Sequence, residues 1–124
     1  MIVETLADKV VGDGKKDVRD VYSLAIRSII HQLHDLAAVN MIRAVFPKLM
    51  KGLKVGGEEI KEEVLEILTE IFKNFAQILI KQNNLVNKED VLQQVCELLL
   101  FQGKGVRKKA TNCLGQFAIV LTQR

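Results

Sequence analysis

The apolar residues near the C-terminal end of the chain recur at the spacing of an α-helix. On a helical wheel, those between residues 106 and 121 fall on one side and the polar residues fall opposite. This pattern predicts an amphipathic helix. Its expected buried stripe is Val106, Ala110, Cys113, Leu114, Phe117, Ala118 and Leu121, and its expected exposed side carries Arg107, Lys108, Asn112 and Gln116.

The same pattern occurs twice earlier in the chain. Each copy has an apolar residue, a basic residue and then four apolar or aromatic residues on the same helical stripe. The copies begin at Val18, Ile60 and Val106, so the intervals are 42 and 46 residues, within the ~40 to 47 residue period of HEAT and armadillo repeats. A period of this length accommodates two helices and their turns. The matching residues are Val18, Arg19, Tyr22, Ala25, Ile26 and Ile29; Ile60, Lys61, Val64, Ile67, Leu68 and Ile71; and Val106, Arg107, Ala110, Cys113, Leu114 and Phe117.

Amphipathic segments between the copies supply the partner helices. We expect helices over residues 2–11, 17–33, 36–53, 58–74, 88–101 and from 106 onward, with 75–80 either prolonging the fourth helix or forming a short extra turn. The expected inner face of 36–53 is Val39, Ile42, Val45, Phe46, Leu49, Met50 and Leu53. That of 88–101 is Val91, Leu92, Val95, Leu98, Leu99 and Leu100.

Cap and turn residues separate these segments. Asp17 is the expected N-cap of the second helix, and Asn87 that of the helix over 88–101, with Asp90 at the capping-box position. Glycines at 12 and 14, 56 and 57, and 103 and 105 mark turns. Pro47 lies inside the third helix, where a missing N–H predicts a kink.

Together these elements predict an all-α fold, an α-solenoid of about three HEAT-type helix pairs from a right-handed superhelix. The repeats are expected over residues 1–34, 35–80 and 81–124 of a single domain. A composition of 48 % apolar and only 5 % aromatic residues, with one proline, also argues for helices rather than a sandwich or barrel. Because neither end carries a polar capping repeat, we expect a piece of a longer array.

Charge, cysteines and hydropathy narrow the classes of partner. The formal charge is only +3 and the two signs are interspersed, which gives weak grounds for nucleic-acid binding. Cys96 and Cys113 lie among apolar neighbours, which predicts buried free thiols in a reducing compartment, the cytoplasm or nucleus. The sequence has neither a run of ~18 apolar residues nor a signal-peptide pattern, so we expect a soluble protein without a membrane partner.

Three clusters resemble chemical sites, and we interpret each as structural. His31, His34 and Asp35 lack further ligands at zinc-like spacing. Gly103-Lys104-Gly105 has a helix-turn-helix setting, whereas a phosphate-binding loop follows a strand. The glutamates of 58–70 are expected on the exposed side of their helix, paired at most with Lys61 or Lys73. We therefore expect no enzyme activity, no catalytic residues, no metal and no cofactor.

Two of the motif helices resemble a known family. Residues 17–30, DVRDVYSLAIRSII, are similar to a helix with the pattern D-x-R-D-x-x-S-x-x-L/I-K/R in the cullin-associated, neddylation-dissociated family of HEAT scaffolds. Residues 106–117, VRKKATNCLGQF, are similar to a later helix of that family reading A-V-R-K-R-T-x-x-A-L-G. The resemblance runs from Asp17 to Thr122, a small part of such a protein.

The resemblance implies a scaffold that binds the cullin-RING core of a ubiquitin ligase, blocks neddylation and exchanges substrate receptors. Stacked second helices of such a repeat line a concave surface. The candidate partner-binding residues are Arg19, Arg27, Lys61, Arg107 and Lys108, with Ser23, Glu62, Glu66 and Asn112 beside them, and Tyr22 as the weakest candidate. Another solenoid function, as a transport receptor or adaptor that binds a small GTPase or cargo, stays open.

Overall fold

Seven α-helices joined by short turns make up the part of the chain that the structure describes. A computed structural model describes the backbone of residues 2–12 and 16–122 and the side chains of 4–12 and 19–122. No strand occurs in this part of the chain. The helices are α1 (Ile2–Val11), α2 (Lys16–Ile30), α3 (Asp35–Val55), α4 (Glu58–Asn74), α5 (Ala76–Lys81), α6 (Lys88–Leu98) and α7 (Lys104–Thr122).

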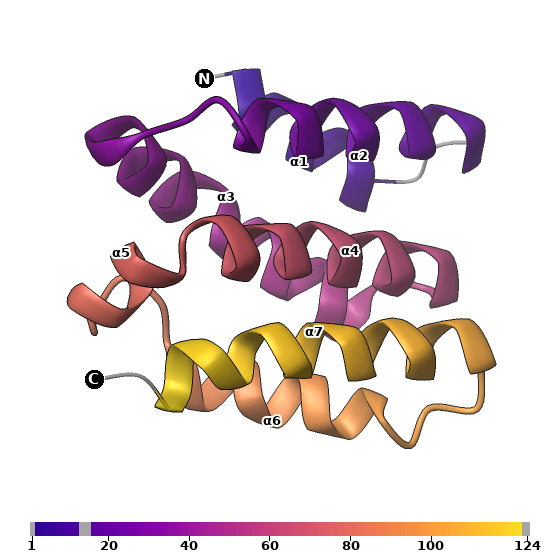
Figure 1. The fold of residues 1–124 in the computed structure, drawn as a ribbon. Helices are drawn as coiled ribbons and strands as arrows, with labels where there is room; N and C mark the ends of the chain where they lie inside the picture. Colours follow the sequence, from indigo (N-terminus) through magenta and orange to yellow (C-terminus); the bar gives the residue numbers. More distant parts are fainter. Residues whose placement is uncertain (1, 13–15, 123–124) are drawn as a thin grey trace.

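The helices stack as three antiparallel pairs, α1 with α2, α3 with α4, and α6 with α7 (Figure 1). In this view α2, α4 and α7 lie side by side in front, and their partners lie behind them. The short helix α5 packs against α4 and α7. The fold is therefore the predicted all-α solenoid of HEAT-type pairs, while the repeat boundaries at residues 34 and 80 stay a prediction.

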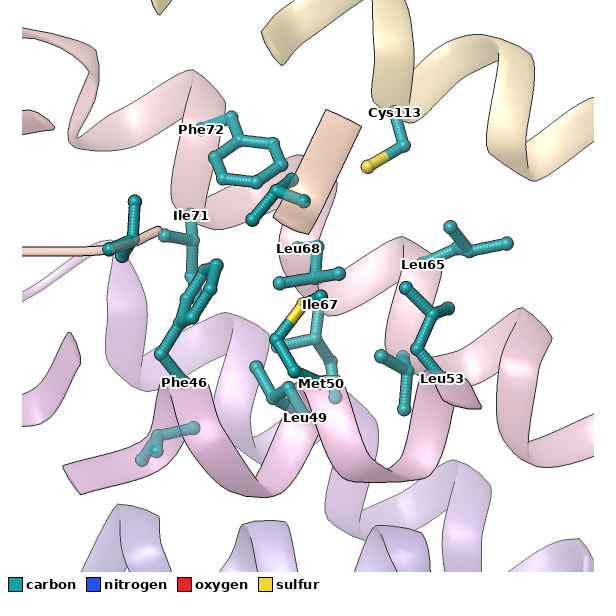
Figure 2. Close-up of a cluster of buried hydrophobic side chains, with 14 of the residues drawn as sticks. Phe46, Leu49, Met50, Leu53, Leu65, Ile67, Leu68, Ile71, Phe72 and Cys113 are labelled. Carbon is teal, nitrogen blue, oxygen red and sulfur yellow. The ribbon is translucent and has the colours of Figure 1, made fainter. Parts of the chain in front are cut away.

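The core lies between the two layers of helices and continues from one pair to the next. Side chains of α3, α4 and α7 meet there, and Figure 2 shows Phe46, Phe72 and Cys113 approaching from the three helices. The ring centroids of Phe46 and Phe72 are 6.4 Å apart, and those of Phe72 and Phe117 are 4.7 Å apart. All seven apolar residues predicted for the inner face of α3 are buried.

The sequence predictions are wrong where helices end. The helix expected over 88–101 stops at Leu98, because the amides of Leu99, Leu100 and Phe101 donate to carbonyls three residues back in a tighter turn. This turn leaves Leu100 88 % exposed, and Leu92 also faces outward. In α7, Val120 is buried instead of Ala118 and Leu121, since the helix presents its 113, 117 and 120 positions to the core.

The cap predictions are partly confirmed. Asn87 caps α6 by accepting the Asp90 amide at 3.1 Å, as predicted. The Asp90 carboxylate, however, pairs with the Lys54 ammonium at 3.0 Å and so ties α6 to α3. Asp17 is not the N-cap of α2, which begins one residue earlier at Lys16. Similarly, α7 begins at Lys104 inside the expected turn, and residues 13–15 of the first predicted turn lie outside the described part.

The two cysteines have different environments. Cys113 is buried as predicted, and burial raises the pKa of its thiol to about 12, partly opposed by the Thr69 hydroxyl. Cys96 is exposed, contrary to the prediction, because α6 turns its 91, 95 and 98 positions toward the core and 96 away from it. Both thiols are free.

Candidate protein-binding face

The second helices of the three pairs form one continuous exposed surface, which we call the α2/α4/α7 face (Figure 1). The middle helix, α4, contributes a row of glutamates to this face. Because the apolar residues of α4 point into the core, its glutamates are left along the opposite side at intervals of about one turn. These glutamates are Glu59, Glu62, Glu66 and Glu70.

Two arginines of α2 and the histidine that follows α2 lie against this glutamate row. Arg19 forms an ion pair with Glu59, Arg27 lies 3.4 Å from the Glu66 carboxylate, and the His31 imidazole lies 3.4 Å from Glu70. The three pairs keep nearly the same separation in sequence, as two parallel helices in fixed register require. The glutamates therefore connect α4 to α2.

The third helix contributes a cation from the other side. The Lys109 ammonium lies 2.6 Å from Glu66 Oε1, while Arg27 approaches Glu66 Oε2. Glu66 is thus shared by α2, α4 and α7. Each of these side chains is about 30 % exposed, so the pairs are accessible to solvent and contribute modestly to stability.

The expected partners within α4 are not the ones observed. The Lys61 ammonium turns back under the α3–α4 turn and donates to the carbonyls of Leu53 at 2.6 Å and Lys54 at 3.4 Å. Partial burial there lowers the pKa of Lys61. Lys73 makes no ion pair in the described part of the chain. Instead, stacking brings basic side chains of the neighbouring helices to the glutamates. The prediction considered only residues within α4 and therefore missed these pairs.

A signal for this arrangement is present in the repeated motif. Counted from the first motif residue of each copy, Arg27 stands at offset 9, Glu66 at offset 6 and Lys109 at offset 3. The constant step of three residues is about one helical turn, the stagger between successive stacked helices. Aligning the copies with this stagger would have placed the three charges together.

Two adjoining hollows open on this face. One, of about 360 Å³, is lined by residues of both charges and by two neutral polar residues: Arg27, Glu66, Glu70, Lys108, Lys109, Thr69 and Asn112. The other, of about 260 Å³, is lined by five carboxylates and one ammonium: Asp20, Glu59, Glu62, Glu63, Glu66 and Lys109. Because Glu66 and Lys109 line both, the hollows meet at the shared ion pair.

The acidic hollow holds a carboxyl group with a perturbed pKa. Burial between α2 and α4 raises the pKa of Glu63, and the nearby Asp20 and Glu66 carboxylates raise it further. The Ser23 hydroxyl acts in the opposite direction. A cation in the hollow would relieve the repulsion among these groups, so its electrostatics favour a positively charged ligand group.

The structure brings together only two of the five predicted site residues. Arg27 and Lys108 line the same hollow. Arg19 is buried at 7 % exposure beside Glu59, and Lys61 bonds carbonyl groups at the end of α3. The Arg107 guanidinium donates to the Phe101 and Gln102 carbonyls at 3.0 Å each, holding the turn before α7. Partner binding by these residues stays a prediction.

The other chemical clusters of the sequence do not converge on a site. Within the described residues, no group of three or more His, Cys, Asp and Glu side chains is placed to hold a metal ion. Beside Gly103 and Gly105 lie the carboxylates of Glu58 and Glu62, which would repel a phosphate. Across the described helices, none combines the length and the apolar character needed to cross a bilayer.

Comparison with known proteins finds one distant similarity that agrees with the fold. The chain is 26 % identical over 119 residues to Cullin-associated NEDD8-dissociated protein 1 of Arabidopsis thaliana, a HEAT-repeat protein. The alignment covers 94 % of this chain and 9 % of that protein. No protein-family model matches the chain, and no solved structure matches it. The similarity and the stacked pairs support a HEAT-repeat scaffold, and the chain spans only about a tenth of its relative.

Proposed function

We propose that the chain is a non-enzymatic scaffold segment whose α2/α4/α7 face binds a partner protein, and that this partner is the cullin-RING core of a ubiquitin ligase. In this proposal the segment belongs to a regulator of ligase assembly in the cytoplasm or nucleus, which blocks neddylation and exchanges substrate receptors. The observation that carries the proposal is the pair of adjoining charged hollows, which lie on a face built from all three repeats.

The ion pairs on this face support a binding role because they hold its side chains in place before a partner arrives. Glu66 is fixed from both sides by Arg27 and Lys109, so less side-chain freedom is lost on binding. Lys108 and Glu62 line the hollows without an ion pair in the described part of the chain. They are the groups best placed to pair with charges of a partner.

A charge-swap variant tests this face. Glu62→Lys combined with Lys108→Glu leaves the net charge unchanged and breaks none of the ion pairs described above. We expect its affinity for a purified cullin-RING subcomplex, measured by biolayer interferometry, to fall at least about tenfold. The matched control, Lys81→Glu with Glu89→Lys, changes two exposed residues outside both hollows and should bind like the unmodified chain.

The same measurement separates the proposal from the other solenoid function. Equal binding by the charge swap and the control would exclude the α2/α4/α7 face. If the chain bound a small GTPase or its cargo and did not bind the cullin-RING subcomplex, the cullin assignment would be wrong, while a protein-binding scaffold would stand.

A further inference from the structure

A second hollow surface lies along the outer side of α3, away from the α2/α4/α7 face. This α3 groove has a volume of about 490 Å³ and is lined by α3, by the connection between α5 and α6, and by the start of α6. It takes no residue from α2, α4 or α7. Its use would therefore not compete directly with a partner on the opposite helices.

The floor of the α3 groove is apolar. It consists of the outer edges of core residues, among them Ile42, Phe46, Met50 and Val86, and each of these is less than a tenth exposed. Val55 stands at the end of the groove with 75 % of its surface exposed. If apolar side chains of a ligand covered this floor, apolar surface would be removed from water, which would make the free energy of binding more favourable.

The rim of the groove is basic. Arg43 and Lys51 stand one turn on either side of Pro47, both exposed, and neither makes an ion pair within residues 4–12 and 19–122. The third cation, Lys54, is already held by Asp90 at 3.0 Å on the α6 side. The groove therefore has two uncompensated positive charges beside an apolar floor.

Pro47 adds a hydrogen-bond acceptor at the centre of the groove. Proline has no N–H, so the Arg43 carbonyl one turn earlier lacks its usual helical donor. Both residues line the groove. A donor group from a ligand could satisfy that carbonyl.

The dimensions of the groove suit a short peptide segment. From Ile42 to Val55 the groove follows α3 for 14 residues, which is about 20 Å at 1.5 Å per residue. A helix of three to four turns has this length. Binding of an amphipathic helix in an apolar groove uses side chains spaced at i, i+3, i+4 and i+7.

We propose that the α3 groove binds a short acidic amphipathic segment of a partner protein, with its apolar side chains on the floor and its carboxylates at Arg43 and Lys51. The basic rim disfavours a basic segment. A second copy of this chain is also disfavoured, because a two-fold symmetric contact would set the same cations against one another.

The test uses the 124-residue chain and a fluorescein-labelled peptide of about 14 residues, with leucine at the i, i+3, i+4 and i+7 positions and glutamate or alanine elsewhere. Two control peptides are used. One has lysine in place of every glutamate, and the other has serine in place of every leucine. Fluorescence anisotropy should show binding of the leucine-glutamate peptide and at least about tenfold weaker binding of the other two.

Variants of the chain then locate the site. Arg43→Glu with Lys51→Glu should weaken binding at least about tenfold, whereas Lys73→Glu with Lys81→Glu, which reverses two exposed charges elsewhere, should not. Val55→Asp should also weaken binding, and Leu100→Asp, at an even more exposed leucine, should leave it unchanged.

The proposal is overturned if the leucine-glutamate peptide fails to bind at 1 mM, about the weakest affinity the assay resolves. Equal binding of the serine or lysine peptide, or equal loss in the two charge-reversal variants, would show nonspecific adsorption and overturn it as well. Sedimentation of the chain as a dimer that Arg43→Glu with Lys51→Glu dissociates would assign the groove to a second copy. None of these outcomes bears on the α2/α4/α7 face, because Glu62 and Lys108 are unchanged throughout.

Discussion

The rings of Phe72 and Phe117 lie with their centroids 4.7 Å apart and their planes at 39°, although α4 and α7 belong to different helix pairs. Both side chains are completely buried, and Phe46 extends the contact back to α3. One aromatic cluster thus spans two repeats. A repeat protein depends on such interfaces because a single pair cannot bury its apolar face alone.

Truncating Phe117 should uncouple the last pair from the stack. We expect Phe117→Leu to lower the free energy of unfolding by about 1 kcal/mol and Phe117→Ala by about 3 to 5 kcal/mol, since the alanine leaves a cavity beside Phe72. Urea denaturation followed by circular dichroism measures both. Ile119→Ala, at an exposed position of the same helix, is the control and should change stability by less than about 0.5 kcal/mol. A similar loss in the control would mean that removing any large apolar side chain from α7, and not the aromatic contact in particular, governs the result.

Two helical glycines should respond to alanine in opposite directions. A Cβ at Gly52 would lie 2.7 Å from Val11 Cγ1 and 3.2 Å from Val64 Cγ2, where three helices meet. At Gly115 it would meet no atom within 4 Å. We expect Gly52→Ala to lose about 1 kcal/mol, because overpacking outweighs the gain in helix propensity, and Gly115→Ala to gain about 0.5 to 1 kcal/mol. The midpoints of urea denaturation measure both changes in stability. A stabilising effect of Gly52→Ala would contradict the prediction and show that α1 can shift to make room for the added methyl group.

The raised pKa of Glu63 predicts a pH-dependent effect of its removal. Its pKa is higher in the folded chain than the ordinary 4.5, so the folded state holds this proton more tightly than the unfolded state. The stabilisation from protonated Glu63 is complete below pH 4.5 and is lost as the pH rises through the folded-state pKa. Glu63→Gln, which is always neutral, should therefore be more stable than the unmodified chain at pH 7. This difference should shrink toward pH 4.

Stability curves at pH 4 and pH 7 measure that difference directly. Glu89→Gln, at an exposed glutamate on α6, is the control for loss of one negative charge and should show no such change with pH. A Glu63→Gln effect that is the same at both pH values would mean that shape, and not ionisation, sets the stability at this position.

The two cysteines should differ in reactivity. Exposed Cys96 should react with a disulfide reagent at pH 8 at least about a hundredfold faster than Cys113, whose thiol is buried and has its pKa raised to about 12. Absorbance of the released thiolate gives both rates. The Cys96→Ser variant should lose the fast phase and keep the slow one. Unfolding the chain in urea should expose the Cys113 thiol and make it react quickly. A fast phase that persists in Cys96→Ser would show that α7 opens readily.

Much of the fold follows from local spacing. The six-position motif correctly placed Ile67 and Cys113 in the core and located α2, α4 and α7, because helical periodicity depends only on neighbours in sequence. The same reasoning failed at Leu100, where a tight turn ends α6 early. Whether a leucine after the last helical residue continues the helix depends on what the following turn packs against.

The candidate site was less predictable than the fold. Arg19 and Arg27 were proposed to bind a partner, which stays a prediction, and their pairing with glutamates of α4 was not predicted. A helical wheel shows which side chains leave the core and carries no information on the neighbouring helix. The α3 groove depends on Leu85 and Val86, which follow α5 and return to α3 only in the folded chain.

Apolar spacing alone was enough to predict the helices, most of their buried positions and their repeated pairing, since each of these follows from the need to remove apolar surface from water. The pairing of the charges and the positions of the hollows became visible only in the folded chain. Those features depend on the stagger between stacked helices and on the path of the connections, which arise from contacts between residues about forty positions apart. Glu66 illustrates both contributions. The apolar spacing of α4 places it on the exposed side of that helix, and the stacking of α2 and α7 against α4 brings Arg27 and Lys109 to its carboxylate.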